Sequence, residues 1–101
     1  MTAVRWTQPA NDDFLGLVTW IATERPASAA SVGRRILNAV ELLRDFPMQG
    51  RPGRSPDTRE LVISGLPYLV VYCIDSADLE TLVILRVLHG AMLWPPAQET
   101  S

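Results

Sequence analysis

Apolar residues recur at helical spacing in two successive segments of the first half of the chain. The first segment predicts a helix from about Pro9 to Glu24, with an apolar stripe formed by Ala10, Phe14, Leu17, Val18 and Ile21. Pro26 follows where proline can open a helix, and the second stripe is formed by Ala29, Val32, Ile36, Val40 and Leu43. Phe46-Pro47 ends this second helix. Two helices joined this closely predict a helical hairpin.

The start of the first helix carries polar residues typical of a helix N-terminus. Thr7 is a candidate cap, because a threonine hydroxyl at this position accepts a free backbone N–H. Asp12 and Asp13 are predicted to lie in the first turns, where the helix dipole favours negative charge.

Strand-like patterns make up most of the remaining chain. Apolar and polar residues alternate from Ala3 to Thr7, which predicts a short strand. Three apolar runs bounded by turn residues predict an antiparallel meander, and they cover Thr58 to Ser64, Tyr68 to Ile74 and Leu82 to Leu88. The segment from Met48 to Asp57 contains two prolines and two glycines and is predicted to be a loop.

The element order β-α-α-β-β-β predicts an α+β fold with a four-stranded, mainly antiparallel sheet and the helical hairpin on one face. The last predicted strand, Leu82 to Leu88, is the most apolar, so we expect it inside the sheet. Its neighbours are expected to be the strand at Ala3 to Thr7 and the strand at Tyr68 to Ile74. Two helices cover one face, and we expect the other face to be partly open and apolar. Residues 1–101 are interpreted as one domain with a core of about residues 3–95.

Arg86 interrupts the last apolar run, which closes with His89, the single histidine of the chain. A charge inside such a strand costs several kcal/mol, roughly, unless it is paired or faces solvent. Two interpretations stay open: Arg86 reaches an open face, or it pairs with a carboxylate such as Glu60. Trp94 is predicted to pack the chain end onto the sheet.

Charge and composition narrow the class of protein. The net charge is −2 and all nine basic residues are arginine, so we expect no surface built for direct, specific DNA binding. One cysteine excludes an internal disulfide, and no apolar run reaches the roughly 18 residues of a membrane span. The N-terminus has no apolar core of a secretion signal. These observations predict a cytoplasmic protein that does not bind membranes.

Several short motifs, in order, resemble the RelE/ParE superfamily of toxins, and the ParE branch, also called plasmid stabilisation proteins, is the closer match. The resemblance covers about Ala3 to Pro95. It rests on Val4-Arg5-Trp6-Thr7 followed by Ala10 and Asp13, on Phe46-Pro47-Met48-Gln49-Gly50-Arg51-Pro52-Gly53-Arg54, on Thr58-Arg59-Glu60-Leu61-Val62, on Gly65-Leu66-Pro67-Tyr68-Leu69-Val70-Val71-Tyr72, on Ile84-Leu85-Arg86-Val87-Leu88-His89-Gly90 and on Trp94-Pro95.

The resemblance implies a toxin of a type II toxin–antitoxin system that causes growth arrest and needs no metal or cofactor. ParE-type toxins poison DNA gyrase, whereas RelE-type toxins cut mRNA in the ribosomal A site. In a RelE-type nuclease the phosphate-binding groups would be Arg51, Arg54, Arg59 and Arg86, and His89 would be the general acid or base. The tyrosine frequent near the end of such nucleases is missing. The missing tyrosine and the negative net charge together favour a gyrase inhibitor without catalytic residues.

The expected partner is a ParD-like antitoxin bound in a toxin–antitoxin hetero-oligomer. Its acidic or amphipathic tail is predicted to cover the apolar residues Trp20, Leu37 and Leu42. Its carboxylates would pair with Arg51, Arg54, Arg59 and Arg86. A third interpretation is an inactive toxin-like module that binds only the antitoxin.

Overall fold

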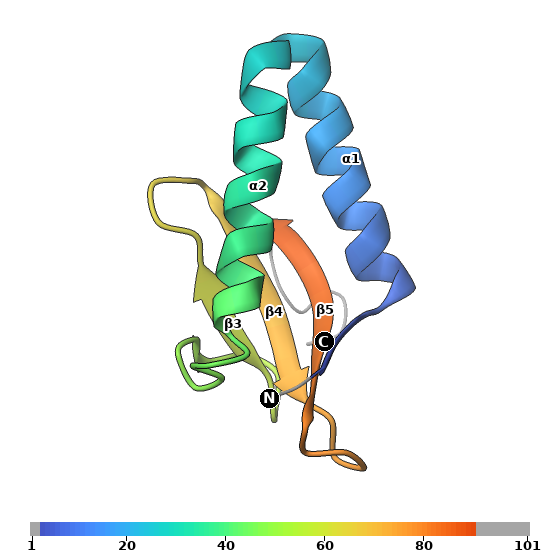
Figure 1. The fold of residues 1–101 in the computed structure, drawn as a ribbon, viewed down its shortest axis with the longest axis vertical. Helices are drawn as coiled ribbons and strands as arrows, with labels where there is room; N and C mark the ends of the chain where they lie inside the picture. Colours follow the sequence, from blue (N-terminus) through green and yellow to red (C-terminus); the bar gives the residue numbers. More distant parts are fainter. Residues whose placement is uncertain (1–2, 91–101) are drawn as a thin grey trace, which may run out of the picture.

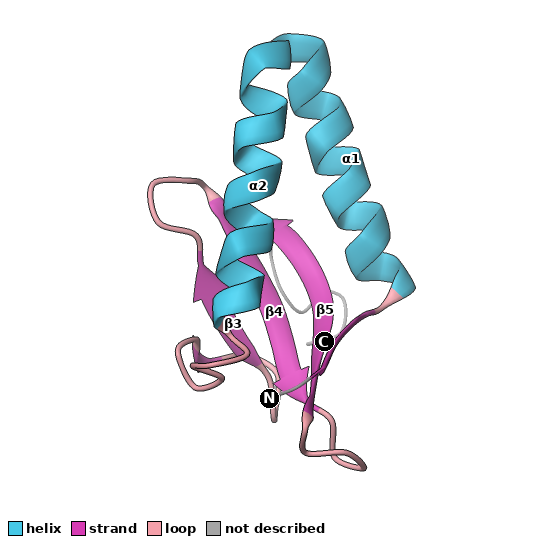
Figure 2. Ribbon diagram, in the orientation of Figure 1, coloured by secondary structure: helices cyan, strands magenta, loops and turns pink. Residues whose placement is uncertain are grey.

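Two helices form a hairpin that stands against one face of a twisted sheet, as the computed structural model shows for the described residues 3–90 (Figures 1 and 2). The elements in chain order are β1 (Ala3–Trp6), α1 (Gln8–Glu24), α2 (Pro26–Leu42), β2 (Arg51–Pro52), β3 (Arg59–Val62), β4 (Tyr68–Ile74) and β5 (Thr81–His89). The predicted hairpin, meander and α+β class are confirmed. Trp94, predicted to pack on the sheet, lies outside the described residues.

The sheet has the strand order β1-β5-β4-β3-β2. As predicted, β5 lies inside the sheet between β1 and β4; it is parallel to β1 and antiparallel to β4. The prediction of a plain loop from Met48 to Asp57 is wrong at β2, which adds a fifth strand. Arg51 pairs with Glu60 and Pro52 pairs with Arg59. A two-residue strand has no periodicity to detect, and proline is tolerated at a sheet edge.

The start of α1 is fixed to β5 by Thr7. Its hydroxyl oxygen accepts the N–H of Ala10 at 3.2 Å, which confirms the predicted cap, and the same hydroxyl donates to the carbonyl of Leu85 at 3.0 Å. Asp12 and Asp13 lie beyond the first helical turn, which contains no acidic residue. Their predicted role at the helix dipole is therefore wrong.

The main core lies between the hairpin and the sheet. The helical stripes predicted from the sequence supply much of it, and its buried members are Ala10, Ile36, Val40, Leu43, Leu61, Ile63, Val70, Tyr72, Leu82, Ile84 and Val87. Burial of these side chains is the main stabilising term of such a fold.

A β-bulge in β5 changes the alternation of its side chains. Leu82, Ile84 and Val87 all belong to the main core, so the spacing is two residues and then three. The register shifts at the same point, where Val71 pairs with Arg86 and Tyr72 pairs with Ile84. One extra residue on one strand is the definition of a bulge, and bulges often redirect a side chain beside a functional site.

The opposite face of the sheet differs from the prediction of an open apolar surface. Leu69, Val71 and Leu88 are buried there in a second cluster, against which Leu85 packs. The prediction is therefore wrong at the centre of this face, where these side chains of β4 and β5 are buried and not open to solvent. Val62, on the same face of β3, remains exposed.

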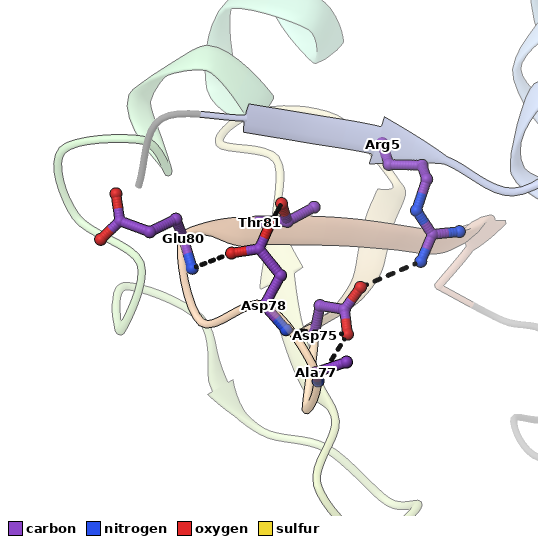
Figure 3. Close-up of polar contacts among 6 residues, drawn as sticks. All are labelled: Arg5, Asp75, Ala77, Asp78, Glu80 and Thr81. Carbon is purple, nitrogen blue, oxygen red and sulfur yellow. Dashed lines mark hydrogen bonds and ion pairs between the residues drawn. The ribbon is translucent and has the colours of Figure 1, made fainter.

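The turn between β4 and β5 is held by aspartates and is tied to β1 (Figure 3). Asp75 accepts the N–H of Ala77 at 2.8 Å and forms an ion pair with Arg5 at 3.4 Å. Asp78 accepts the hydroxyl proton of Thr81 at 2.9 Å. The hydrogen bond from Ala77, with smaller contributions from the N–H of Asp78 and from Arg5, lowers the pKa of Asp75 below its ordinary value.

This pKa shift predicts an acid dependence of stability. Since the pKa of Asp75 is lower in the folded state, its contribution is fully present above its unfolded pKa of about 3.9. The contribution is lost as the pH falls through the folded pKa. We expect Asp75→Asn to flatten the loss of stability below about pH 4, measured as urea midpoints from pH 6 to pH 2. The exposed Asp45→Asn is the control, and identical curves for wild type and Asp75→Asn would contradict the prediction.

Candidate functional site

Arg86 is held by a carboxylate of α1. Its Nε and Nη2 donate to Oδ2 and Oδ1 of Asp13 at 2.7 and 2.9 Å, and the N–H of Val87 donates to Oδ2 at 3.0 Å. Arg86 therefore pairs with a carboxylate, which is one of the two interpretations that the sequence left open. The carboxylate is that of Asp13 and not that of Glu60. The hydrogen bond with Asp13 raises the pKa of Arg86. We call this group the Asp13–Arg86 latch.

The bulge and the helix spacing together explain the latch. A bulge disturbs the ladder hydrogen bonds beside it, and the carboxylate of Asp13 receives the N–H of Val87 at this point. Asp13 follows the buried Ala10 by three residues, so it lies on the side of α1 that faces the sheet. A carboxylate within an apolar helical stripe was the sequence signal for this role, and sequence reasoning missed it.

Glu60 instead binds two arginines that precede β3, Arg51 of β2 and Arg54 of the segment between β2 and β3. Its side chain is 1% exposed, and it accepts Nη2 of Arg51 at 3.2 Å and the N–H of Arg54 at 3.1 Å. The Nε of Arg54 lies 3.7 Å from the same carboxylate. A buried carboxylate needs such partners, because an unpaired one would be strongly destabilising. Arg51 and Arg54 are therefore partly engaged in the fold.

Arg59 and Tyr72 fix the backbone that follows α2. The Tyr72 hydroxyl donates to the carbonyl of Pro47 at 2.8 Å and accepts the N–H of Gly50 at 2.9 Å. Nη1 of Arg59 donates to the carbonyl of Gly50 at 2.6 Å. A Cβ at position 50 would lie 2.7 Å from the Tyr72 ring, so this close approach requires glycine. Burial raises the pKa of Tyr72, which keeps the hydroxyl proton available as a donor.

The five residues predicted for a nuclease are only partly brought together. Arg51, Arg54 and His89 line one hollow of about 270 Å³ beside the turn between β3 and β4. Arg59 lines a different hollow of about 380 Å³, and Arg86 is bound in the latch. His89 also contacts the ring of Tyr68 edge to face, with centroids 5.7 Å apart.

A groove lies between α1 and the sheet, beside Tyr68 of β4 and Val87 of β5. It joins two hollows that share Trp20 and Tyr68, and we call it the hairpin groove. The smaller hollow, of about 330 Å³, is lined by Asp13, Leu17, Trp20, Tyr68, Val87, Leu88 and His89. The larger, of about 870 Å³, lies towards the start of α2 and includes Arg25 and Arg35. An apolar groove with cationic residues at one end suits an amphipathic helix that carries acidic groups.

The exposed apolar residues predicted to bind an antitoxin do not form one surface. Trp20 lies in the hairpin groove, whereas Leu42 lines a separate hollow of about 540 Å³ at the end of α2. Leu37 is exposed and lines neither hollow. We call the second surface the α2-end patch, formed by Leu42, Phe46, Pro47, Met48 and Gln49. Sequence reasoning missed Phe46 and Met48, because a proline-containing turn has no periodicity that reveals exposure.

Within residues 3–90, no group of three or more His, Cys, Asp or Glu side chains is placed to hold a metal ion. The same part of the chain contains no helix of the length and apolar character that crossing a bilayer requires.

Solved toxin–antitoxin structures share this fold. The chain matches a chromosomal ParDE system from P. aeruginosa with a TM-score of 0.77 and 22% identity, over 88% of this chain and 96% of that chain. It matches the E. coli RelBE complex with a TM-score of 0.64 and 11% identity, over 86% of this chain and 94% of that chain. It matches the RelBE2 complex from Mycobacterium tuberculosis with a TM-score of 0.58 and 30% identity, over 87% of this chain and 96% of that chain.

Sequence comparison gives the family. A family described as "ParE toxin of type II toxin-antitoxin system, parDE" matches residues 4–94. A protein of Sinorhizobium fredii named "Putative toxin Y4kP" is 41% identical over 92 residues, which are 91% of this chain and 92% of that protein. The chain therefore belongs to the ParE toxin family of type II toxin–antitoxin systems, which confirms the resemblance found in its sequence.

The latch predicts a difference between two adjacent aspartates. Asp13→Ala removes an acceptor shared by Arg86 and the N–H of Val87, so we expect the free energy of unfolding to fall by about 1–3 kcal/mol. Asp12→Ala removes an exposed contact with Gln8 and should cost less than about 0.5 kcal/mol. Urea denaturation measures both values. Equal effects of the two substitutions would contradict a special role for Asp13.

Proposed function

We propose that this toxin is neutralised by a ParD-like antitoxin bound in a hetero-oligomer, and that it acts on DNA gyrase by binding rather than by catalysis. The observation that carries this proposal is the contrast between two sites. The hairpin groove offers apolar side chains around the exposed Trp20, with charged side chains towards its ends. The predicted nuclease residues, in contrast, are divided between a hollow, a structural hydrogen-bond network and the latch.

The groove supports an antitoxin segment as partner. Trp20 lies where the two hollows of the groove meet and is 61% exposed. A large aromatic side chain in this position is typical of an interface anchor. Arg25 and Arg35 outnumber Glu24 in the hollow towards the start of α2, where they favour an acidic segment. An antitoxin tail that folds on contact would bury this surface.

A matched pair of residues tests the groove. Trp20→Ala is expected to weaken the binding of the antitoxin encoded by the adjacent gene by at least about tenfold, because it removes the central anchor. Leu15→Ala is the control, since Leu15 lies on the same helix, is 62% exposed and lines neither hollow of the groove. Isothermal titration gives both affinities. An equal loss for the two variants would contradict a docking site at Trp20.

The charges support binding of a protein target. A nuclease of the ribosomal A site works among dense phosphates and benefits from positive charge, whereas this chain has a net charge of −2. Arg86 is bonded to Asp13 through two nitrogens, and Arg51 and Arg54 contact the buried Glu60. These carboxylates reduce the net positive charge that the guanidinium groups offer to a phosphate. A gyrase inhibitor requires a complementary surface and no catalytic residues.

The runner-up is a ribosome-dependent endoribonuclease, and one observation favours it. Arg51, Arg54 and His89 line the same hollow, so two cations and a candidate general acid or base share one site. The third alternative, a module that only binds the antitoxin, would leave cells unaffected when the toxin is induced alone.

Induction of the chain without its antitoxin separates these three functions. We expect growth arrest with filamentation and DNA breaks, and we expect His89→Ala to be equally toxic, because gyrase inhibition would not use this side chain. DNA breakage and mRNA cleavage patterns are measured in the same cultures. Codon-phased mRNA cleavage that His89→Ala abolishes would instead establish the endoribonuclease, and harmless expression would favour the inactive module.

A further inference from the structure

A small apolar cluster lies on the face of the sheet that the helices do not cover. Its members, Leu69, Val71 and Leu88, are 5%, 0% and 4% exposed, and we call them the outer cluster. The hairpin stands against the opposite face, where the main core is found (Figure 2). Within residues 3–90, the partly buried apolar side chain that packs against the outer cluster is Leu85, which belongs to the same sheet.

Such complete burial requires a layer of chain above the sheet. An antiparallel sheet that packs on one face leaves its other face to solvent, and side chains there keep part of their surface exposed. Val62 shows this exposure: it pairs with Leu69 across β3 and β4, faces the same side and is 53% exposed. The low exposures of the outer cluster are those of the single chain, so its cover has to come from the chain itself.

We propose that the segment after Gly90, with Met92, Leu93 and Trp94, folds back over the outer cluster and forms this cover. The proposal goes beyond the proposed function and does not rest on it. Gly90 follows the last residue of β5, and its N–H donates to the carbonyl of Pro67 at 2.6 Å, which fixes the point where the segment begins. The sequence after this point is apolar, so its burial against apolar side chains is favourable.

The dimensions of the sheet permit this placement. Leu88 pairs with Leu69 across β5 and β4, and neighbouring strands lie about 4.8 Å apart. The four residues from Gly90 to Trp94 span at most about 14 Å. A segment that turns back at Gly90 can therefore pass over both strands. Trp94 is predicted from the sequence to pack on the sheet, and the outer cluster identifies the face.

The same segment would limit access to the hollow that Arg51, Arg54 and His89 share. Gly90 lines this hollow of about 270 Å³, so the segment leaves the sheet at its edge. An RNA strand would have to displace the segment in order to reach His89. The cover is thus an intramolecular contact that opposes use of this hollow as a nuclease site.

Fluorescence quenching of the full chain tests whether Trp94 is covered. Difference spectra of wild type against Trp94→Phe and against Trp20→Phe isolate the emission of each tryptophan. Trp20 is the matched reference, because it is 61% exposed. We expect acrylamide to quench Trp94 several-fold less than Trp20. Equal quenching overturns the proposal, and so does protection of Trp94 that disappears on dilution, which would assign the cover to a second copy.

A double-mutant cycle tests which face Trp94 covers. In urea unfolding, we expect the folding equilibrium constant of Trp94→Ala combined with Leu88→Ala to exceed the value for independent effects by at least about threefold. The control cycle combines Trp94→Ala with Leu43→Ala, which should be additive, because Leu43 is buried in the main core on the opposite face.

Leu88→Val and Leu43→Val replace the alanine variants where these do not fold. Additive effects of Trp94 and Leu88 overturn the proposal, and so does an equal coupling of Trp94 with Leu43, which would assign Trp94 to the main core. Neither measurement depends on toxicity, so a failure of the proposed function is distinguishable from a failure of this proposal.

Discussion

The carboxylate of Asp13 accepts three hydrogen bonds and joins the first helix to the last strand where that strand is irregular. The bulge in β5 allows Ile84 and Val87 both to belong to the main core, and Arg86 lies beside this bulge. Without an acceptor from α1, the bulge would leave a charge and a backbone N–H poorly satisfied in a half-buried position. The position of the hairpin on the sheet, and with it the shape of the hairpin groove, therefore depends on this interaction.

A second polar network fixes the other end of the molecule. Glu60 is buried and pairs with Arg51 and Arg54, and Tyr72 anchors the turn after α2. Both side chains extend from strands to irregular segments that have few apolar contacts of their own. Buried polar groups that are fully paired specify one arrangement of such segments. The two exposed surfaces are thus supported by separate networks, so one surface can change without the other.

Periodicity predicted the parts of the fold that depend on burial. The helical stripes and the meander follow from apolar spacing, and the place of β1 follows from the need to fill the edge beside β5. The exposed Trp20 was predictable because it lies off its stripe. Asp13 and Arg86 are 73 residues apart, and only the folded chain brings them together. The two-residue β2 and the exposed turn after α2 have too few residues for any pattern, so the α2-end patch was not predicted.

The latch also limits what Arg86 can do. Two of its nitrogens face a carboxylate at 2.7 and 2.9 Å, and hydrogen bonds to charged groups are worth about 1.5–3 kcal/mol each. A phosphate that approached this guanidinium would meet the negative charge of Asp13 beside it. That charge disfavours a position of Arg86 on a scissile phosphate. In this member of the family the arginine of the last strand therefore has a structural role in joining β5 to α1.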